Sequence, residues 1–161
     1  MTIQQPYVLF LGDAPDPLAA KVAQGIKDWR PGISVGQITL PGCKADMGLK
    51  NISVKEAVSV GAKTLVIGVA NRGGLISSKW MEVLKEAIVS GLDIASGLHN
   101  LLRDEKELVD LSKSNNTQLI DVRVPTINYP IANGKKRMGM RCLAVGTDCS
   151  IGKMYTAIAL E

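Results

Sequence analysis

The local pattern that decides the fold lies in the stretch Tyr7-Val-Leu-Phe-Leu-Gly-Asp-Ala-Pro-Asp-Pro17. Five apolar residues predict a short buried β-strand, and the glycine and aspartate predict the turn that ends it. Pro17 stands where a helix can begin. Apolar residues then recur at helical spacing as far as Trp29, and Pro31-Gly32 predicts the end of that helix. A strand followed by a helix is the repeating unit of a parallel α/β sheet.

The same alternation continues along the chain. Further strands are predicted at 33–40, 64–68, 92–95 and 118–122. Further helices are predicted from the capping box Ser53-Val-Lys-Glu56 to Gly61, over 78–90 and over 101–113, with a loop at 41–52. The fold class is therefore α/β: a three-layer Rossmann-like domain with a parallel sheet of about five strands. We assign this domain to residues 1–122, a linker to 123–140, and the beginning of a P-loop domain to 141–161.

Residues Gly146-Thr-Asp-Cys-Ser-Ile-Gly-Lys153 have the spacing G-x-x-x-x-G-K of a phosphate-binding loop. The run Arg141–Val145 before it predicts a buried strand, and Met154–Glu161 predicts the first turns of a helix. Convergent backbone N–H groups, the helix N-terminus and the lysine can together bind phosphate, although an ordinary glycine-rich turn is the alternative. The predicted cofactor-binding residues are Gly146, Thr147, Asp148, Cys149, Ser150, Ile151, Gly152 and Lys153.

Met154 occupies the position at which a nucleotide-hydrolysing loop has the Ser or Thr that binds Mg²⁺. A thioether is a poor ligand for a hard cation, so we expect the loop to hold phosphate without a metal. The chain ends at Glu161, eight residues after Lys153. We therefore expect an N-terminal fragment of a longer protein, rather than a complete domain whose last helix resembles a P-loop.

Composition narrows the classes of function. At 161 residues and 46% hydrophobic content, the chain can bury one sizeable core. Two Trp, three Tyr and one Phe offer few stacking surfaces, so we expect no nucleic-acid partner. No apolar run is long enough to predict a membrane span, and three cysteines without metal-like spacing favour a reducing cytoplasm. We also expect a homo-oligomer and no metal site.

Parallel sheets bind ligands at the carboxyl ends of their strands, and here those ends are polar and rich in glycine. The predicted strand-end segments are Gly12–Ala14, Gly68–Gly74, Ser96–His99 and Asp121–Arg123. His99 is a candidate general base and Asp13 a candidate to orient an amine or a base, although both could be local caps. Arg72, Asn71 and Arg123 are candidate ligands for an anionic substrate, with an Asp121–Arg123 ion pair as the alternative.

Several of these segments together resemble one bacterial and archaeal family. They are Phe10-Leu-Gly-Asp-Ala-Pro-Asp-Pro17, Trp29-Arg-Pro31, Gly68-Val-Ala-Asn-Arg-Gly-Gly74, Ser96-Gly-Leu-His99 and Asp121-Val-Arg123. The family was long catalogued as a domain of unknown function and includes the D-glutamate N-acetyltransferases of bacterial D-amino-acid catabolism. The resemblance implies a Rossmann-like N-terminal domain followed by a P-loop domain. It covers nearly the whole of this chain.

The resemblance implies acetyl transfer from acetyl-CoA to the amino group of D-glutamate. Acetyl-CoA would be a co-substrate, with no tightly bound cofactor, and the partners would be small molecules. The pyrophosphate of CoA suits a P-loop, and an amino-acid carboxylate suits arginine. We expect the isolated 161 residues to lack transferase activity. The alternatives are a P-loop ATP- or GTP-dependent ligase or kinase, and a non-catalytic nucleotide-binding module.

Overall fold

The computed structural model describes residues 2–70, 75–124, 138–140, 142–147 and 152–160. These residues belong to two compact units, Met1–Thr126 and Ile127–Glu161. The strands of the first unit are β1 (Tyr7–Gly12), β2 (Ser34–Thr39), β3 (Thr64–Ile67), β4 (Asp93–Ser96) and β5 (Leu119–Asp121). Its helices are η1 (Pro17–Ala20), α1 (Lys21–Trp29), α2 (Val54–Ser59), α3 (Ser78–Val89), η3 (Leu102–Asp104) and α4 (Lys106–Asn115).

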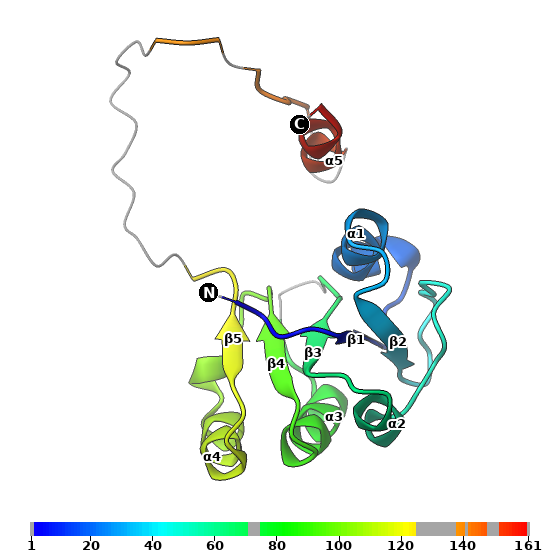
Figure 1. The fold of residues 1–161 in the computed structure, drawn as a ribbon, viewed down its shortest axis with the longest axis vertical. Helices are drawn as coiled ribbons and strands as arrows, with labels where there is room; N and C mark the ends of the chain where they lie inside the picture. The colour runs from blue at the N-terminus through cyan, green and yellow to red at the C-terminus, as the bar shows by residue number, and fades with distance from the viewer. Residues whose placement is uncertain (1, 71–74, 125–137, 141, 148–151, 161) are drawn as a thin grey trace. The chain divides into compact units, whose positions relative to one another are not determined.

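The strands form a parallel sheet in the order β2-β1-β3-β4-β5. Figure 1 shows α1 on one side of this sheet and α2, α3 and α4 on the other. Successive strands are added on one side of β1 and then on the other, so the topology changes direction between β1 and β3. Ligands of open α/β sheets bind at such a switch point, beyond the carboxyl ends of the strands. The predicted three-layer, Rossmann-like α/β fold is confirmed.

One aromatic pair explains the sequence at the end of β1. Phe10 and Trp80 of α3 are fully buried, and their rings meet edge to face with centroids 5.4 Å apart. Gly12 has a φ of 51°, and a Cβ atom there would come within 2.6 Å of the indole. The indole Nε1 of Trp80 donates a hydrogen bond of 2.7 Å to Oδ1 of Asp13. Glycine is therefore required for the close approach, and Asp13 satisfies the polar atom of a buried tryptophan.

Only part of the apolar stripe predicted at helical spacing before Trp29 is buried. Ile26 of α1 packs against the core, whereas Leu18 of η1 and Val22 of α1 are exposed, with 62% and 37% of their surface accessible. Ala23 is buried instead, and its backbone N–H donates to the carbonyl of Gly68 at 3.0 Å. A Cβ atom at Gly68 would lie 2.5 Å from the Cβ of Ala23. The helix approaches the end of β3 so closely that only small residues fit between them.

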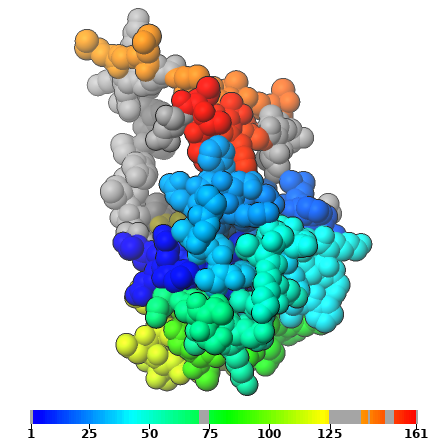
Figure 2. Space-filling model, turned by 45° about the vertical axis from the view of Figure 1, so that its right-hand side comes forward, coloured from blue at the N-terminus to red at the C-terminus, as the bar shows by residue number. Residues whose placement is uncertain are grey.

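The loop between β2 and α2 covers the outer edge of the sheet. Gln37 of β2 exchanges backbone hydrogen bonds with this loop, donating to the carbonyl of Lys50 and accepting from the N–H of Ile52. The side-chain amide of Gln37 also donates to Asp46 at 2.9 Å. Figure 2 shows the loop, in cyan, on the surface of the first unit. These bonds satisfy backbone groups of an edge strand that would otherwise be open to pairing with another chain.

The second unit contains helix α5 (Lys153–Leu160), which confirms the helix predicted after the glycine loop. Gly152 precedes it with a φ of 92°. The strand predicted over Arg141–Val145 is not found in its described part, because residues 142–145 have no regular secondary structure and Leu143 and Val145 are exposed. A strand is held by hydrogen bonds to a neighbour, and the described residues of this unit provide no neighbouring strand. No helix in the described part of the chain has the length and apolar character needed to cross a bilayer.

Candidate functional site

A pocket of about 400 Å³ lies in the first unit, at the carboxyl edge of the sheet. It is formed by the start of α1 and by the residues that follow β3, β4 and β5. The lining residues are Lys21, Val22, Ala70, Gly97, Leu98, His99 and Arg123. This is the edge at which a parallel sheet binds its ligands, and it is the edge to which the polar segments of the sequence pointed.

Within the pocket, the structure brings together two residues that the sequence singled out separately. Nη1 of Arg123 lies 3.0 Å from Nε2 of His99, a hydrogen-bond distance between residues 24 positions apart in the chain. His99 comes from the loop after β4, and Arg123 from the turn after β5. Both side chains are exposed and can therefore contact a ligand in the pocket.

The charge of the pocket favours an anionic ligand. Lys21 and Arg123 each contribute a cationic side chain, and none of the lining residues that the structure describes is acidic. Gly97 leaves backbone accessible beside them. A guanidinium and an ammonium group in one pocket suit a carboxylate or a phosphate.

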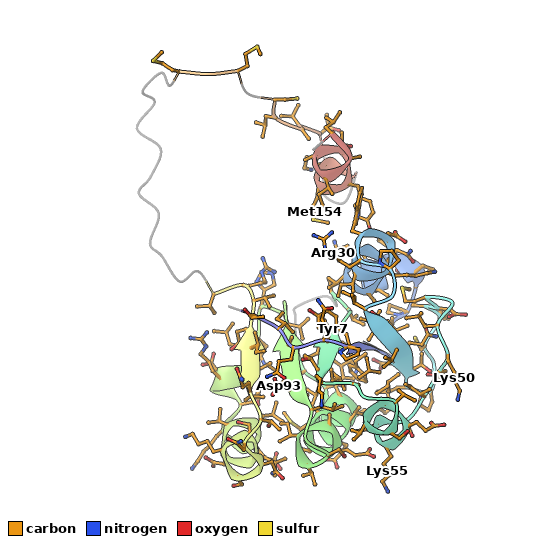
Figure 3. The ribbon with its side chains drawn as sticks, viewed as in Figure 1. Tyr7, Arg30, Lys50, Lys55, Asp93 and Met154 are labelled. Carbon is orange, nitrogen blue, oxygen red and sulfur yellow. The ribbon has the colours of Figure 1, made fainter. Side chains whose placement is uncertain are left out.

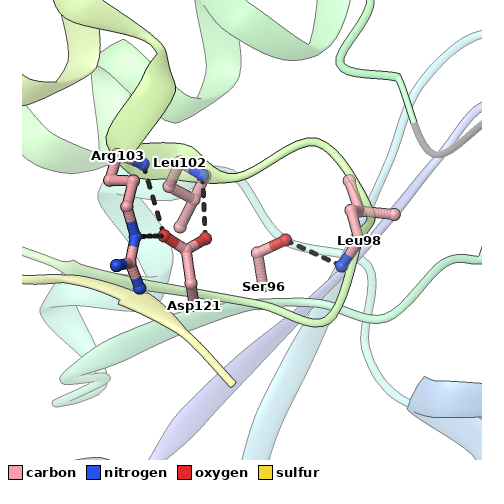
Figure 4. Close-up of polar contacts among 5 residues, drawn as sticks. All are labelled: Ser96, Leu98, Leu102, Arg103 and Asp121. Carbon is pink, nitrogen blue, oxygen red and sulfur yellow. Dashed lines mark hydrogen bonds and ion pairs between the residues drawn. The ribbon is translucent and has the colours of Figure 1, made fainter. Parts of the chain in front are cut away.

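The loop that carries His99 is anchored by Asp121, which is 4% exposed. Oδ1 of Asp121 accepts a hydrogen bond of 2.8 Å from the backbone N–H of Leu102, and Oδ2 accepts from the backbone N–H and from Nε of Arg103 at 3.3 and 3.1 Å (Figure 4). One carboxylate therefore satisfies the backbone donors at the start of η3 and forms an ion pair. It fixes the point at which the loop after β4 re-enters regular structure.

The ion pair between Asp121 and Arg123, considered from the sequence as the alternative to a binding role, is wrong. Asp121 pairs with Arg103, and Arg123 contacts His99. The reason is the turn that follows β5, in which the N–H of Val124 donates back to the carbonyl of Asp121 at 3.4 Å. The turn directs Arg123 to the loop after β4 and leaves the buried carboxylate to Arg103.

The other end of the same loop is held by Ser96, the last residue of β4. Oγ of Ser96 accepts from the N–H of Leu98 at 3.1 Å (Figure 4). The carbonyl of Ser96 accepts from the N–H of Val122 at 2.9 Å. Asn100 adds a hydrogen bond of 2.6 Å from its side-chain amide to Glu105. Sequence reasoning missed Ser96 and Asp121 as supports of the site, although a buried polar residue at the end of a strand was the available signal.

Asp13, the second predicted catalytic residue, does not line this pocket. Its carboxylate binds the indole of Trp80, as described above, so the structure gives it a packing role and leaves its catalytic role a prediction. The predicted substrate ligands Asn71 and Arg72 lie outside the described residues.

The predicted phosphate loop is described in part. Gly146 and Thr147 are exposed, and Lys153 is the first residue of α5. Asp148, Cys149, Ser150 and Ile151 lie outside the described residues. Met154, labelled in Figure 3, follows Lys153 in the helix and is 60% exposed. Among the residues that the structure describes, no cluster of three potential metal ligands occurs.

The sheet order and the pocket together define a Rossmann-like α/β protein with a positively charged site at the carboxyl edge of its sheet. The chain belongs to the family described as a domain of unknown function with a Rossmann-like domain, DUF1611_N, whose model matches residues 38–125. Residues 130–161 match the companion model, described as the P-loop domain DUF1611_C. The resemblance to this family, with a Rossmann-like domain followed by a P-loop segment, is confirmed. The boundaries assigned at 122 and 140 stay a prediction.

Two curated relatives cover almost the whole chain. A protein from Tritonibacter scottomollicae, named D-glutamate N-acetyltransferase, is 64% identical over 159 residues, which is 99% of this chain and 48% of the relative. A protein of the same name from Pseudoalteromonas sp is 48% identical over 161 residues, which is 100% of this chain and 48% of the relative. The chain thus spans about half the length of the curated relatives it matches.

The fold also resembles a crystal structure of a DUF1611 family protein from Anabaena variabilis. The TM-score is 0.67 at 22% sequence identity, over 81% of this chain and 40% of that chain. At this level of identity the similarity supports the fold alone.

Proposed function

We propose that this protein transfers an acetyl group from acetyl-CoA to the amino group of D-glutamate. The observation that carries the proposal is the 64% identity, over nearly the whole chain, to a relative named D-glutamate N-acetyltransferase. The positively charged pocket is consistent with it, because D-glutamate brings two carboxylates. We further propose that the reaction serves D-amino-acid catabolism in the cytoplasm, with acetyl-CoA as co-substrate and a homo-oligomeric protein.

In the proposed reaction, the pocket at the carboxyl edge of the sheet binds the acceptor. Arg123 and Lys21 bind carboxylate, and His99 removes a proton from the ammonium group. The freed nitrogen attacks the thioester carbonyl, an amide bond forms, the C–S bond breaks and CoA leaves as its thiol. Asn71 and Arg72 are proposed as further carboxylate ligands, and Asp13 as a residue that orients the amine or the base.

The loop Gly146–Lys153 is proposed to bind the phosphates of CoA. Its spacing and the match of residues 130–161 to a P-loop domain support this role. Lys153 supplies a full positive charge beside the backbone donors of the loop, and the thioether of Met154 does not suit Mg²⁺. The loop would therefore grip a pyrophosphate without hydrolysing it.

The test is an assay of the complete gene product with acetyl-CoA and D-glutamate, following free thiol and N-acetyl-D-glutamate by mass spectrometry. A charge-assisted hydrogen bond contributes about 1.5–3 kcal/mol, so losing one weakens binding about ten- to a hundredfold. Arg123→Ala should raise the KM for D-glutamate by this factor and leave that for acetyl-CoA nearly unchanged, whereas Lys153→Ala should do the reverse. Each variant is thus the control for the other.

A second outcome would replace the proposal. Because the G-x-x-x-x-G-K spacing is also that of nucleotide hydrolases, ATP and GTP are tested in parallel with Mg²⁺. Nucleotide hydrolysis without release of CoA thiol would assign the protein to the ligases or kinases. Binding of nucleotide without any turnover would favour a non-catalytic nucleotide-binding module.

A further inference from the structure

We propose that Arg123 covers the reactive nitrogen of His99 and that a carboxylate of the acceptor uncovers it. The inference rests on the proposed acyl transfer and concerns the regulation of the same pocket. It makes Arg123 a positioning residue that couples recognition of the substrate to the availability of the base.

The chemistry of the two side chains fixes the direction of the hydrogen bond between them. A guanidinium group has only N–H donors and no acceptor. At 3.0 Å from Nη1 of Arg123, Nε2 of His99 must therefore be the acceptor, with its lone pair directed at the arginine. The ring proton then resides on Nδ1. In this arrangement His99 has no free lone pair on Nε2 with which to accept a proton from a substrate.

A carboxylate of the substrate can displace His99 as the partner of Arg123. The imidazole offers Arg123 a single acceptor atom, whereas a carboxylate offers two oxygens that match the fork of the guanidinium and carry charge. Both side chains are exposed, so a ligand can reach them. Lys21 lines the same pocket and adds to its attraction for an anion. A bound carboxylate is therefore a stronger hydrogen-bond partner for Arg123 than the imidazole of His99 is.

The release of His99 allows one proton to move from the substrate to the imidazole. When Arg123 turns to the carboxylate, Nε2 of His99 is free to accept one proton from the ammonium group of the acceptor. The ring becomes an imidazolium, and the nitrogen regains the lone pair that attacks the thioester carbonyl. The imidazolium later returns its proton to water. An amine that lacks a carboxylate leaves His99 covered, so this arrangement selects amino acids at the step that generates the nucleophile.

The anchoring of both partners keeps the arrangement defined. The loop that carries His99 is fixed at Ser96 and at Leu102, and Arg123 lies two residues beyond Asp121. Only the two side chains need to rotate for the exchange, because their backbones are held by the ends of β4 and β5.

The experiment uses the fact that the chain contains a single histidine. Long-range ¹H–¹⁵N NMR correlations of the histidine-labelled 161-residue chain, recorded at about pH 8, identify which ring nitrogen carries the proton. We expect Nδ1–H in the wild type. Arg123→Ala should convert the ring to the Nε2–H form that neutral imidazole prefers in water, and Arg123→Lys, which keeps a cationic donor, should retain Nδ1–H. An Nε2–H ring in the wild type, or no change in Arg123→Ala, would overturn the proposal.

Ligands test the uncovering step directly. Glutarate supplies the carboxylates of the acceptor without its amine, and glutaramide is the matched neutral control. Saturating glutarate should move the wild-type ring signals toward those of Arg123→Ala, and glutaramide should not. Unchanged signals at saturation, or equal effects of the two ligands, would refute the uncovering step. A complete gene product that fails to acetylate D-glutamate would refute the proposed function and leave these NMR results standing, so the two failures are distinguishable.

Discussion

At the scale of single residues, Asp13 is the position where a structural and a catalytic role must be separated. Its carboxylate satisfies the buried indole N–H of Trp80. Asp13→Asn keeps an oxygen acceptor and removes the charge, whereas Asp13→Ala also leaves the N–H without a partner, at a cost of about 1–3 kcal/mol. If Asp13 acts in catalysis, Asp13→Asn should lose activity and keep its melting temperature. Retention of both would assign the residue to packing alone.

The anchor Asp121 provides a second prediction at this scale. Asp121→Ala leaves the N–H of the buried Leu102 without its acceptor, and we expect the free energy of unfolding to fall by about 1–3 kcal/mol. Arg103→Ala removes only the exposed partner of the ion pair and should cost at most about 1 kcal/mol. Urea denaturation of the two variants measures the difference. Equal losses would mean that the ion pair, and not the backbone hydrogen bonds, fixes η3.

A third prediction concerns the contact of α1 with the sheet. Gly68→Ala would place a methyl group 2.5 Å from the Cβ of Ala23, so the helix must move outward. Overpacking of this kind costs about 1–3 kcal/mol. The helix start contributes Lys21 to the pocket, so ligand binding should weaken together with stability. Gly61→Ala is the control for backbone strain. The added methyl group meets no atom within 4 Å there, so this variant tests only the cost of a positive φ.

At the scale of elements, the start of α2 predicts a specific response to pH. The backbone N–H and the hydroxyl of Ser53 both donate to Oε2 of Glu56, at 2.8 and 2.9 Å. These bonds lower the pKa of Glu56 below its ordinary value of 4.5. A carboxyl with a lowered pKa in the folded state adds stability above its unfolded pKa and loses it as the pH falls through the folded value.

We therefore expect Glu56→Gln to be less stable than the wild type near neutral pH, with the difference shrinking below about pH 4. Urea denaturation midpoints at about pH 7 and about pH 3 provide the comparison. Glu86→Gln, an exposed change on α3, is the control. A difference that grows in acid would contradict the assignment.

Most helices and strands were predicted correctly from the sequence, but one helix was not. Short apolar runs located all five strands of the sheet, because the central strands of a parallel sheet are buried on both faces. Helical spacing located the main helices, because a surface helix buries one face. The predicted helix over 101–113 is divided into η3 and α4, because Asp121, distant in sequence, captures the backbone N–H groups of Leu102 and Arg103. A local pattern contains no information about such a partner.

The same limit applies to the site. The sequence identified His99 and Arg123 one at a time, from residue type and from their positions after strands. Their contact depends on the turn at residues 122–123 and on the strand order β4-β5, which follow from tertiary structure. Exposure of Leu18 and Val22 was missed for a related reason, since helical spacing cannot tell which of two faces packs on a glycine.

At the scale of the whole molecule, the buried apolar side chains of the described residues lie between Val8 and Ile120. A chain shortened to residues 1–126 should therefore fold by itself and unfold in one cooperative transition. We expect its melting temperature to lie within about 4 °C of that of the 161-residue chain, the shift that about 1 kcal/mol produces. Calorimetry of both chains provides the measurement. A larger loss would mean that residues 127–161 contribute to the stability of the first unit.

Strand β5 closes one edge of the sheet and pairs with β4 through only three residues. It supplies both the carboxylate that anchors the loop of His99 and, just beyond its end, the arginine that faces His99. Edge strands open by local fluctuations far more often than a whole domain unfolds. Each such opening would release the loop of His99 and displace Arg123 at the same time. The amide of Val122, which is hydrogen-bonded to the carbonyl of Ser96, would exchange its hydrogen in the same event. The hydrogen-exchange lifetime of the Val122 amide therefore measures how long the site stays assembled.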